Sequence, residues 1–196
     1  MSTTGLEKNK LAMVDLDGTL VFTLNANYLS YKQALNDYGF DVSREYFAEH
    51  CDGRAYRDFL PALTDGDSAS IEAVHDRKIQ LYGECLRSAE LNRHMVAILR
   101  AIKGEYYLAL VTTATKINAE RLLEHFGLTG LFDMVVTQED VKRSKPDPAC
   151  YNAVIERFGV DRESCIIFED SAAGVAAALS SGCETFVVKG REKEGS

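Results

Sequence analysis

Five short runs of apolar residues are spaced along the chain, and they predict the strands of one buried sheet. The runs are LAMVD, YYLALVT, FDMVVT, CIIFED and ETFVVKG. Unbroken apolar runs of this kind are typical of parallel strands that are covered on both faces. From the second run onward, segments with helical spacing alternate with the runs, and this alternation predicts an α/β doubly wound domain.

Three glycines mark the expected ends of the helices in this domain. Gly127, Gly159 and Gly182 each follow a segment with helical character, and the last of these segments is rich in alanine. Glycine is favoured just past the last turn of a helix, because it adopts the left-handed backbone conformation at little cost. We therefore expect these helices to end at or just before the three glycines.

A long segment between the first two apolar runs contains no strand-like pattern and far exceeds a normal crossover connection. Tyr28, Tyr31, Leu35 and Tyr38 share one face of a first predicted helix, and a longer helix with one charged face follows. The pattern therefore predicts a sheet domain, residues 1–21 and 92–196, that is interrupted by a helical insertion, residues 22–91.

Composition narrows the environment and the partners of this 196-residue chain. Its formal net charge is −8, which disfavours nucleic acid or an anionic membrane as a general partner. No stretch approaches the roughly 20 apolar residues of a membrane span. The five cysteines are scattered without a CxxC spacing, as in reduced intracellular proteins. We expect a soluble, cytoplasmic protein that is a monomer or a weak dimer.

Residues that could carry chemistry follow four of the five predicted strands: Asp15, Asp17, Thr112, Thr113, Lys145, Glu169 and Asp170. In open α/β sheets, ligands bind outside the carboxyl ends of the strands. Four carboxylates in one cleft cannot all be ionised without cations, and an all-oxygen set of ligands suits Mg²⁺. The sequence therefore predicts a magnesium site that, together with Lys145, would attract a phosphoryl group.

Each of these motifs also has a simpler structural explanation when it is taken alone. DLDG has the composition of an ordinary turn after a strand, RSKPDP could be a helix-entry loop, and EDS could cap a helix. Their occurrence together at consecutive strand ends favours a functional site over three unrelated structural features.

The motifs DLDGTL, LVTTAT, RSKPDP and IIFEDSAAG resemble, in order and in strand context, the four motifs of the haloacid dehalogenase superfamily of phosphohydrolases. The resemblance extends from about Lys10 to Gly190. It implies a Rossmann-like catalytic core with the small helical cap of the β-phosphoglucomutase and phosphoglycolate-phosphatase branch. It also implies a Mg²⁺-dependent phosphatase whose substrate is a small phosphorylated metabolite, such as a sugar phosphate.

The resemblance implies a role for each residue of the core motifs. Asp15 would be the nucleophile that forms an aspartyl-phosphate, and Asp17 would protonate the leaving oxygen and then activate water. Thr112 and the backbone N–H of Thr113 would hold phosphoryl oxygens. Lys145 would balance the charge of Asp15 and of the phosphoryl group.

The resemblance also implies the metal ligands and the type of leaving group. Mg²⁺ would be held by the Asp15 carboxylate, the Asp17 carbonyl and Asp170, with Glu169 as a direct or water-mediated ligand. Dehalogenases of this superfamily have no acid at the position of Asp17, since a halide leaves without a proton. The acid here therefore favours the cleavage of an oxygen ester.

The helical insertion is expected to close over the site and to contact the part of the substrate that does not react. Asn27, Arg54 and Lys78 are its candidate substrate-binding residues, and for Arg54 and Lys78 the alternative is a solvated helix face without a role in binding. Arg54 is the leading candidate, because CDGRAYRDFL is similar to the glycine-containing substrate loop of the branch.

Two alternatives to a phosphatase remain open at this point. A β-phosphoglucomutase-type phosphomutase is disfavoured by Phe22, where the branch usually has an acid, and by Asn27, where the mutase has a histidine. A phosphate- or metal-binding module related to receiver domains is disfavoured by the large insertion after the first strand and by the combined DLDGT motif.

Overall fold

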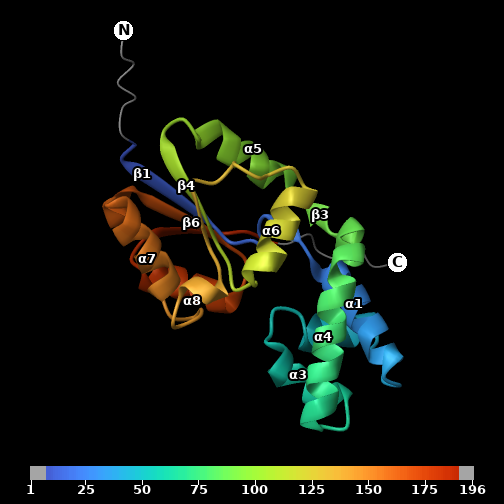
Figure 1. Cartoon of the computed structure of the whole chain (residues 1–196). Coiled ribbons are helices and arrows are strands. Elements are labelled where there is room, and N and C mark those ends of the chain that lie inside the picture. The colour runs from blue at the N-terminus through green and yellow to red at the C-terminus, as the bar shows by residue number, and fades with distance from the viewer. Residues whose placement is uncertain (1–7, 190–196) are drawn as a thin grey trace. The chain divides into compact units, whose positions relative to one another are not determined.

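The computed structural model describes residues 8–189, which form two compact units (Figure 1). The first unit contains the chain up to Val21 and from Leu91 onward, and the second unit is Phe22–Glu90. Residues 1–7 and 190–196 of the predicted sheet domain, including Gly190, lie outside the described residues.

A five-stranded parallel sheet forms the centre of the first unit, with the strand order β5-β4-β1-β6-β7. The strands are β1 (Lys10–Val14), β4 (Tyr106–Val111), β5 (Met134–Val136), β6 (Cys165–Glu169) and β7 (Glu184–Val187). The chain leaves the central strand β1 in one direction through β4 and β5, and later returns on its other side through β6 and β7. This reversal beside β1 is the switch point at which ligands of such sheets bind.

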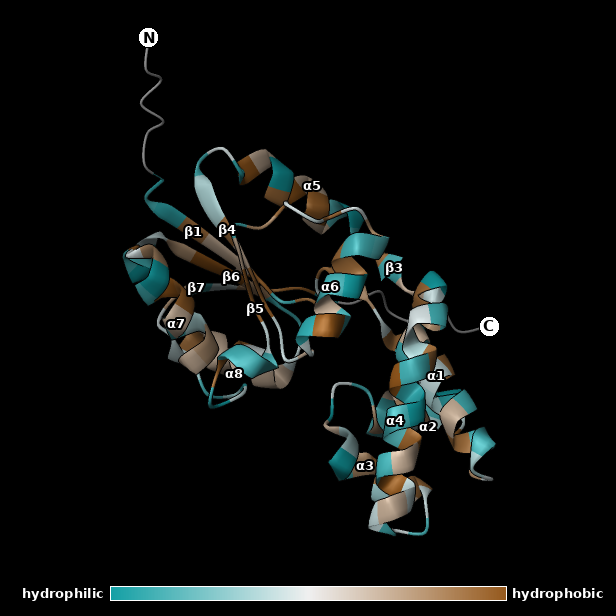
Figure 2. Ribbon diagram, viewed as in Figure 1, coloured by the Kyte–Doolittle hydropathy of each residue, from teal (hydrophilic) through white to brown (hydrophobic). Residues whose placement is uncertain are grey.

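Helices cover both faces of the sheet, as the predicted doubly wound architecture requires (Figure 1). One face packs against α7 (Ala149–Phe158) and α8 (Ala172–Ser180) in a buried apolar cluster. The helices α5 (Arg93–Ile102) and α6 (Lys116–His125) lie on the opposite face. Figure 2 shows hydrophobic residues along the strands and on part of each surrounding helix. The α/β prediction is confirmed.

The helix ends in this unit follow local sequence rules. Thr115 and Ser171 are the N-cap residues of α6 and α8, and each side chain accepts a hydrogen bond from a backbone N–H three residues later. Gly127 and Gly159 adopt φ values of 63° and 64° just after α6 and α7, as their positions in the sequence predicted.

The second unit is helical and contains α1 (Leu24–Asp37), α2 (Arg44–His50), α3 (Tyr56–Leu63) and α4 (Ser68–Cys85). Its core is aromatic: the ring of Tyr31 packs against Phe47 and Phe59 with centroid distances of 5.7 and 5.1 Å.

Three details of the sequence analysis were wrong. Tyr38 was placed on the apolar face of the first helix, but α1 ends one residue earlier and Tyr38 is 48% exposed. The run ETFVVKG was expected to be covered on both faces, yet β7 is an edge strand, and Phe186 and Val187 are exposed. The short paired strands β2 (Val21–Phe22) and β3 (Glu90–Leu91) were missed. Two residues are too few to show a periodic pattern.

None of the helices in the described part of the chain is long and apolar enough to cross a membrane.

Candidate active site

The carboxyl ends of the central strands bring the predicted core residues together in the first unit. Asp15 directly follows β1, and its backbone N–H extends the ladder to β6 by donating to the Phe168 carbonyl at 3.0 Å. Thr112 follows β4 and extends that ladder to β5, where its N–H donates to the Val136 carbonyl at 2.9 Å. Parallel strands end at one edge of a sheet, so residues distant in sequence become neighbours there.

Lys145 joins this edge from the loop between β5 and α7, and its side chain is only 4% exposed. Its Nζ donates to Asp15 Oδ1 at 2.6 Å, to Glu169 Oε1 at 2.5 Å and to the Val111 carbonyl at 3.0 Å. Three hydrogen bonds match the three protons of an ammonium group. Burial lowers the pKa of Lys145, but the charges of Asp15 and Glu169 outweigh burial and raise that pKa above its usual value. Lys145 is therefore a fixed positive charge beside Asp15.

Glu169 is fully buried at the end of β6, and both of its carboxylate oxygens accept several hydrogen bonds. Oε1 accepts from Lys145 and from the Tyr151 hydroxyl, the latter at 2.8 Å. Oε2 accepts from the backbone N–H groups of Asp170 and Ser171 at 3.1 and 3.3 Å, and from the Ser171 hydroxyl at 3.3 Å. This many donors compensates for the loss of solvent around a buried charge and holds the carboxylate in one orientation.

Two glycines leave the space that the acidic residues occupy. A Cβ atom on Gly174 would lie 2.0 Å from Glu169 Oε1, and one on Gly18 would lie 1.9 Å from Asp170 Oδ2. Gly18 also has a φ of 86°, a conformation that disfavours other residues. Asp170 is further fixed by the Thr19 hydroxyl, which donates to its Oδ1 at 2.9 Å.

Asp15, Glu169 and Asp170 form a group of carboxylates that fits a metal ion, because each offers an oxygen within 4.8 Å of the others. Burial is the main cause that raises the pKa of both Asp15 and Asp170, and the neighbouring Glu169 charge adds to it, while Lys145 opposes the shift of Asp15. The single ammonium of Lys145 contacts two of these three carboxylates, Asp15 and Glu169. An oxygen-only set with excess negative charge suits a hard divalent cation such as Mg²⁺.

The remaining candidates of the core, Asp17, Thr112 and Thr113, lie at the same edge of the sheet but differ in local structure and in burial. Asp17 is not part of β1, which ends at Val14, but lies in the following turn and bridges to Val21. Its charge contributes to the raised pKa of Asp15. Thr112 is buried and its Oγ1 accepts from the Ala114 N–H at 3.0 Å, whereas Thr113 is exposed.

The three candidate residues of the helical unit differ in their exposure to solvent. Asn27 is partly exposed on α1, and Arg54 is exposed in the loop between α2 and α3. Lys78 on α4 is only 7% exposed, and its Nζ lies 5.2 and 4.1 Å from the ring centroids of Tyr31 and Tyr82. All three belong to the second unit, and their role in substrate binding stays a prediction.

Two residues of the site were not among those predicted from the sequence: Tyr151, which donates to Glu169, and Gly174, which leaves space for it. Tyr151 lies at helical spacing from Val154 and Ile155, so it looks like an ordinary core position, and only its hydroxyl distinguishes it. Gly174 stands inside a helix rich in alanine, where glycine is the less favourable residue. A glycine at such a position indicates that something approaches the backbone closely.

The chain is similar to known proteins over most of its length. The family model described as "Haloacid dehalogenase-like hydrolase" matches residues 12–188. The phosphorylated carbohydrates phosphatase of Thermotoga maritima is 31% identical over 176 residues, which cover 87% of this chain and 80% of that protein. The fructose-1-phosphate phosphatase of Escherichia coli is 26% identical over 177 residues, which cover 89% and 94%. The crystal structure of a predicted phosphoglycolate phosphatase from Haemophilus somnus has a TM-score of 0.83 and 26% identity, and the match covers 92% and 85%.

Proposed function

Because the chain belongs to the haloacid dehalogenase-like hydrolase family, we propose that it is a Mg²⁺-dependent phosphatase of a small phosphorylated metabolite, in particular a sugar phosphate. The observation that carries this proposal is the buried contact of Lys145 with Asp15 and Glu169, beside Asp170, at the switch point of the sheet. The sugar phosphate class is supported by the names of the two relatives, which act on phosphorylated carbohydrates and on fructose 1-phosphate.

In the first step, the Asp15 carboxylate attacks phosphorus in line with the ester oxygen. The bond from phosphorus to the sugar oxygen breaks as the bond to Asp15 forms, which gives an aspartyl-phosphate. Asp17 donates a proton to the departing oxygen, so the sugar leaves as an alcohol.

In the second step, Asp17 takes a proton from a water molecule that attacks phosphorus. The bond between phosphorus and Asp15 breaks, inorganic phosphate leaves and the Asp15 carboxylate is restored. An acid that becomes a base in this way works best with a raised pKa, which a nearby carboxylate such as Asp15 favours.

Thr112 and the Thr113 N–H would hold phosphoryl oxygens during both steps, and Lys145 would keep Asp15 ionised and oriented for attack. A bound Mg²⁺ supplies positive charge to the phosphoryl oxygens. Its ligands would be the Asp15 carboxylate, the Asp17 carbonyl and Asp170. Glu169 already accepts several hydrogen bonds from protein groups, which favours its water-mediated form of ligation.

The second unit would serve as the cap that selects the substrate, with Asn27, Arg54 and Lys78 as its contact residues. Charged and amide side chains of this kind suit the hydroxyl groups and any second anionic group of a phosphorylated sugar. The protein would act as a monomer or a weak dimer.

The test is a hydrolysis screen of the purified protein with p-nitrophenyl phosphate and a panel of phosphorylated metabolites, with and without Mg²⁺. We expect phosphate release that requires Mg²⁺ and is abolished in Asp15→Asn. Asp17→Asn should lower kcat by about 100- to 10,000-fold, since it removes the general acid and base. If folded protein with Mg²⁺ releases phosphate from no member of the panel, the proposal is wrong.

The same screen tests the phosphomutase alternative. A mutase would return the phosphoryl group from Asp15 to a second hydroxyl rather than to water. Isomerisation of a hexose 1-phosphate that is primed by the bisphosphate, with little release of free phosphate, would therefore replace the phosphatase proposal.

A further inference from the structure

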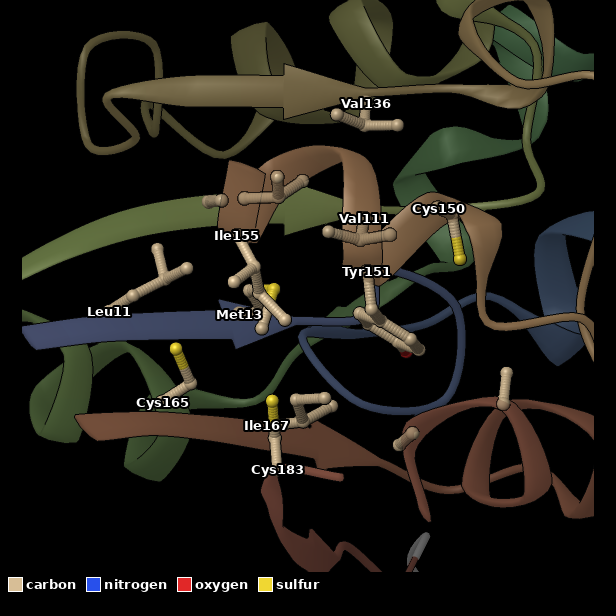
Figure 3. Packing of buried hydrophobic residues seen from close by; sticks show 14 of the residues in the cluster. Leu11, Met13, Val111, Val136, Cys150, Tyr151, Ile155, Cys165, Ile167 and Cys183 are labelled. Atoms are coloured by element: carbon tan, nitrogen blue, oxygen red, sulfur yellow. The ribbon is translucent and has the colours of Figure 1, made fainter. Parts of the chain in front are cut away.

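Tyr151 is a fully buried tyrosine in the first turn of α7, directly after the loop that carries Lys145. It belongs to the apolar cluster between the sheet and α7, whose members include Met13, Val111 and Ile167. Figure 3 shows its ring among these side chains. Phenylalanine would serve such packing equally well, so the hydroxyl is the feature that needs an explanation.

The Tyr151 hydroxyl lies within the hydrogen-bonded group of the site. It donates to Glu169 Oε1 at 2.8 Å, and the same oxygen accepts from Lys145 Nζ at 2.5 Å. The Tyr151 ring centroid is 5.3 Å from Lys145 Nζ, and this Nζ donates to Asp15 Oδ1 at 2.6 Å. One tyrosine thus contacts both the carboxylate and the ammonium that lie beside Asp15.

We propose that Tyr151 is a positioning residue, whose hydroxyl holds Glu169 in the orientation that directs the Lys145 ammonium at Asp15. The inference rests on the proposed phosphatase function for its effect on turnover. Glu169 has two oxygens, and its Oε2 is bound by backbone and serine donors at the start of α8. Besides Lys145 itself, Tyr151 therefore supplies the hydrogen bond that restrains the other oxygen, Oε1.

The chemistry of the contact between Tyr151 and Glu169 supports the proposal that Tyr151 orients the carboxylate. A carboxylate oxygen can only accept, so the Tyr151 hydroxyl is the donor in its 2.8 Å contact with Glu169 Oε1. Without that donor, Oε1 would accept from Lys145 alone, and the ammonium could follow Glu169 away from Asp15. A hydrogen bond in a buried charged network is strong enough for its loss to change this balance.

The experiment compares Tyr151→Phe with a matched control, Tyr107→Phe. Tyr107 is a tyrosine of the same unit, at the amino end of β4, and its ring stacks on Phe158. We expect Tyr151→Phe to lower kcat by about tenfold at saturating Mg²⁺ and to leave KM within twofold, since the residues proposed to bind the substrate are unchanged. The control should leave both constants unchanged.

A second measurement follows the ammonium group directly in metal-free protein. Lys145 is buried and makes three hydrogen bonds, so its ammonium protons should exchange slowly with water and give a separate signal in spectra of ¹⁵N-lysine-labelled protein. The signal is assigned by its loss in Lys145→Arg. We expect Tyr151→Phe to speed this exchange at least tenfold, and Tyr107→Phe to leave it unchanged.

The kcat values and the exchange rate of the Lys145 ammonium protons together test the positioning role separately from the proposed function. A Tyr151→Phe protein that keeps wild-type kcat and a slowly exchanging Lys145 signal, even with a lower melting temperature, would overturn the inference. If the wild-type protein hydrolyses no phosphate but the Lys145 signal depends on the Tyr151 hydroxyl, the proposed function fails and the positioning role stands.

Discussion

Replacing Gly174 by alanine sets two opposing effects against each other. Gly174 lies inside α8, where alanine would stabilise the helix by about 0.8–1.0 kcal/mol relative to glycine. The new Cβ, however, would lie 2.0 Å from both Cδ and Oε1 of Glu169 and 2.1 Å from Oε2. Real Cβ atoms essentially never approach other heavy atoms below 3.0 Å, so Glu169 or α8 has to move.

We expect the steric effect to dominate, because the obstructing group cannot move cheaply. Glu169 is fully buried and is bound by Lys145 and Tyr151 on one oxygen. Breaking a buried ion pair costs about 3–5 kcal/mol, which exceeds the gain in helix propensity. The net result should be a loss of about 2–4 kcal/mol in the free energy of unfolding. Because Lys145 also loses its alignment with Asp15, kcat should fall by about 100-fold.

The assay is urea unfolding together with p-nitrophenyl phosphate turnover, and Gly83→Ala is the matched control. Gly83 is an exposed glycine inside α4, and nothing lies within 4 Å of the position of an added Cβ. This variant should gain up to about 1 kcal/mol in the free energy of unfolding and keep its kcat. If Gly174→Ala is stabilised to the same extent and remains fully active, Glu169 moves aside at little cost and its hydrogen bonds do not fix its position.

Three further predictions follow from other parts of the first unit. In Gly18→Ala, the new Cβ would lie 1.9 Å from Asp170 Oδ2, and alanine would have to adopt a left-handed backbone conformation. Because Asp170 would be displaced, we expect calorimetry to show an affinity for Mg²⁺ that is at least about tenfold weaker. An unchanged affinity would argue against Asp170 as a ligand. Asp140→Ala removes the carboxylate that accepts from the Thr137 N–H and hydroxyl, both at 2.8 Å, and should cost about 1 kcal/mol in urea unfolding at pH 7. These hydrogen bonds lower the pKa of Asp140, so their stabilisation is present at neutral pH and is lost as the pH falls through that lowered pKa. A difference from wild type that does not shrink as the solution is acidified would contradict this cause. Mg²⁺ at 100 times its dissociation constant should raise the free energy of unfolding by about 2.7 kcal/mol. The measurement compares the melting temperature after EDTA treatment with that after readdition of Mg²⁺. An active enzyme whose melting temperature does not change would show that the metal does not bind the folded protein by itself.

The strands and the core of the site were predictable because both depend on strong local patterns. The apolar runs are long enough to identify the five strands of the sheet, and the doubly wound topology then places their carboxyl ends at one edge. The sequence alone therefore assigned five residues to one site: Asp15, Thr112, Lys145, Glu169 and Asp170. The exposure of β7 was not predictable in the same way. An apolar run indicates that a segment can form a strand, but it does not show whether helices or neighbouring strands bury the side chains of that strand.

The orientation of Glu169 depends on contacts that no local pattern contains. Its carboxylate is directed by Tyr151, which is 18 residues earlier in the chain, and by Lys145, which is 24 residues earlier. The sequence places Glu169 beside Asp170 but leaves open whether Glu169 would bind a metal directly or through water. The helical unit presents a similar difficulty, since the spacing that places Lys78 on a helix does not reveal that its side chain is buried against tyrosine rings.

The hydrogen bonds of Lys145 bear on why a metal ion should be needed at all. A lysine at the site could in principle supply the positive charge for a phosphoryl dianion, but this ammonium already donates to Asp15, Glu169 and the Val111 carbonyl. Its charge is therefore used to compensate for the carboxylates of the protein, and a dianionic ligand would meet a site with excess negative charge. Asp170 is the partly exposed carboxylate of the group and accepts a side-chain hydrogen bond from Thr19. We expect it to retain the capacity to bind a cation, so that Lys145 orients the nucleophile while Mg²⁺ balances the charge of the substrate.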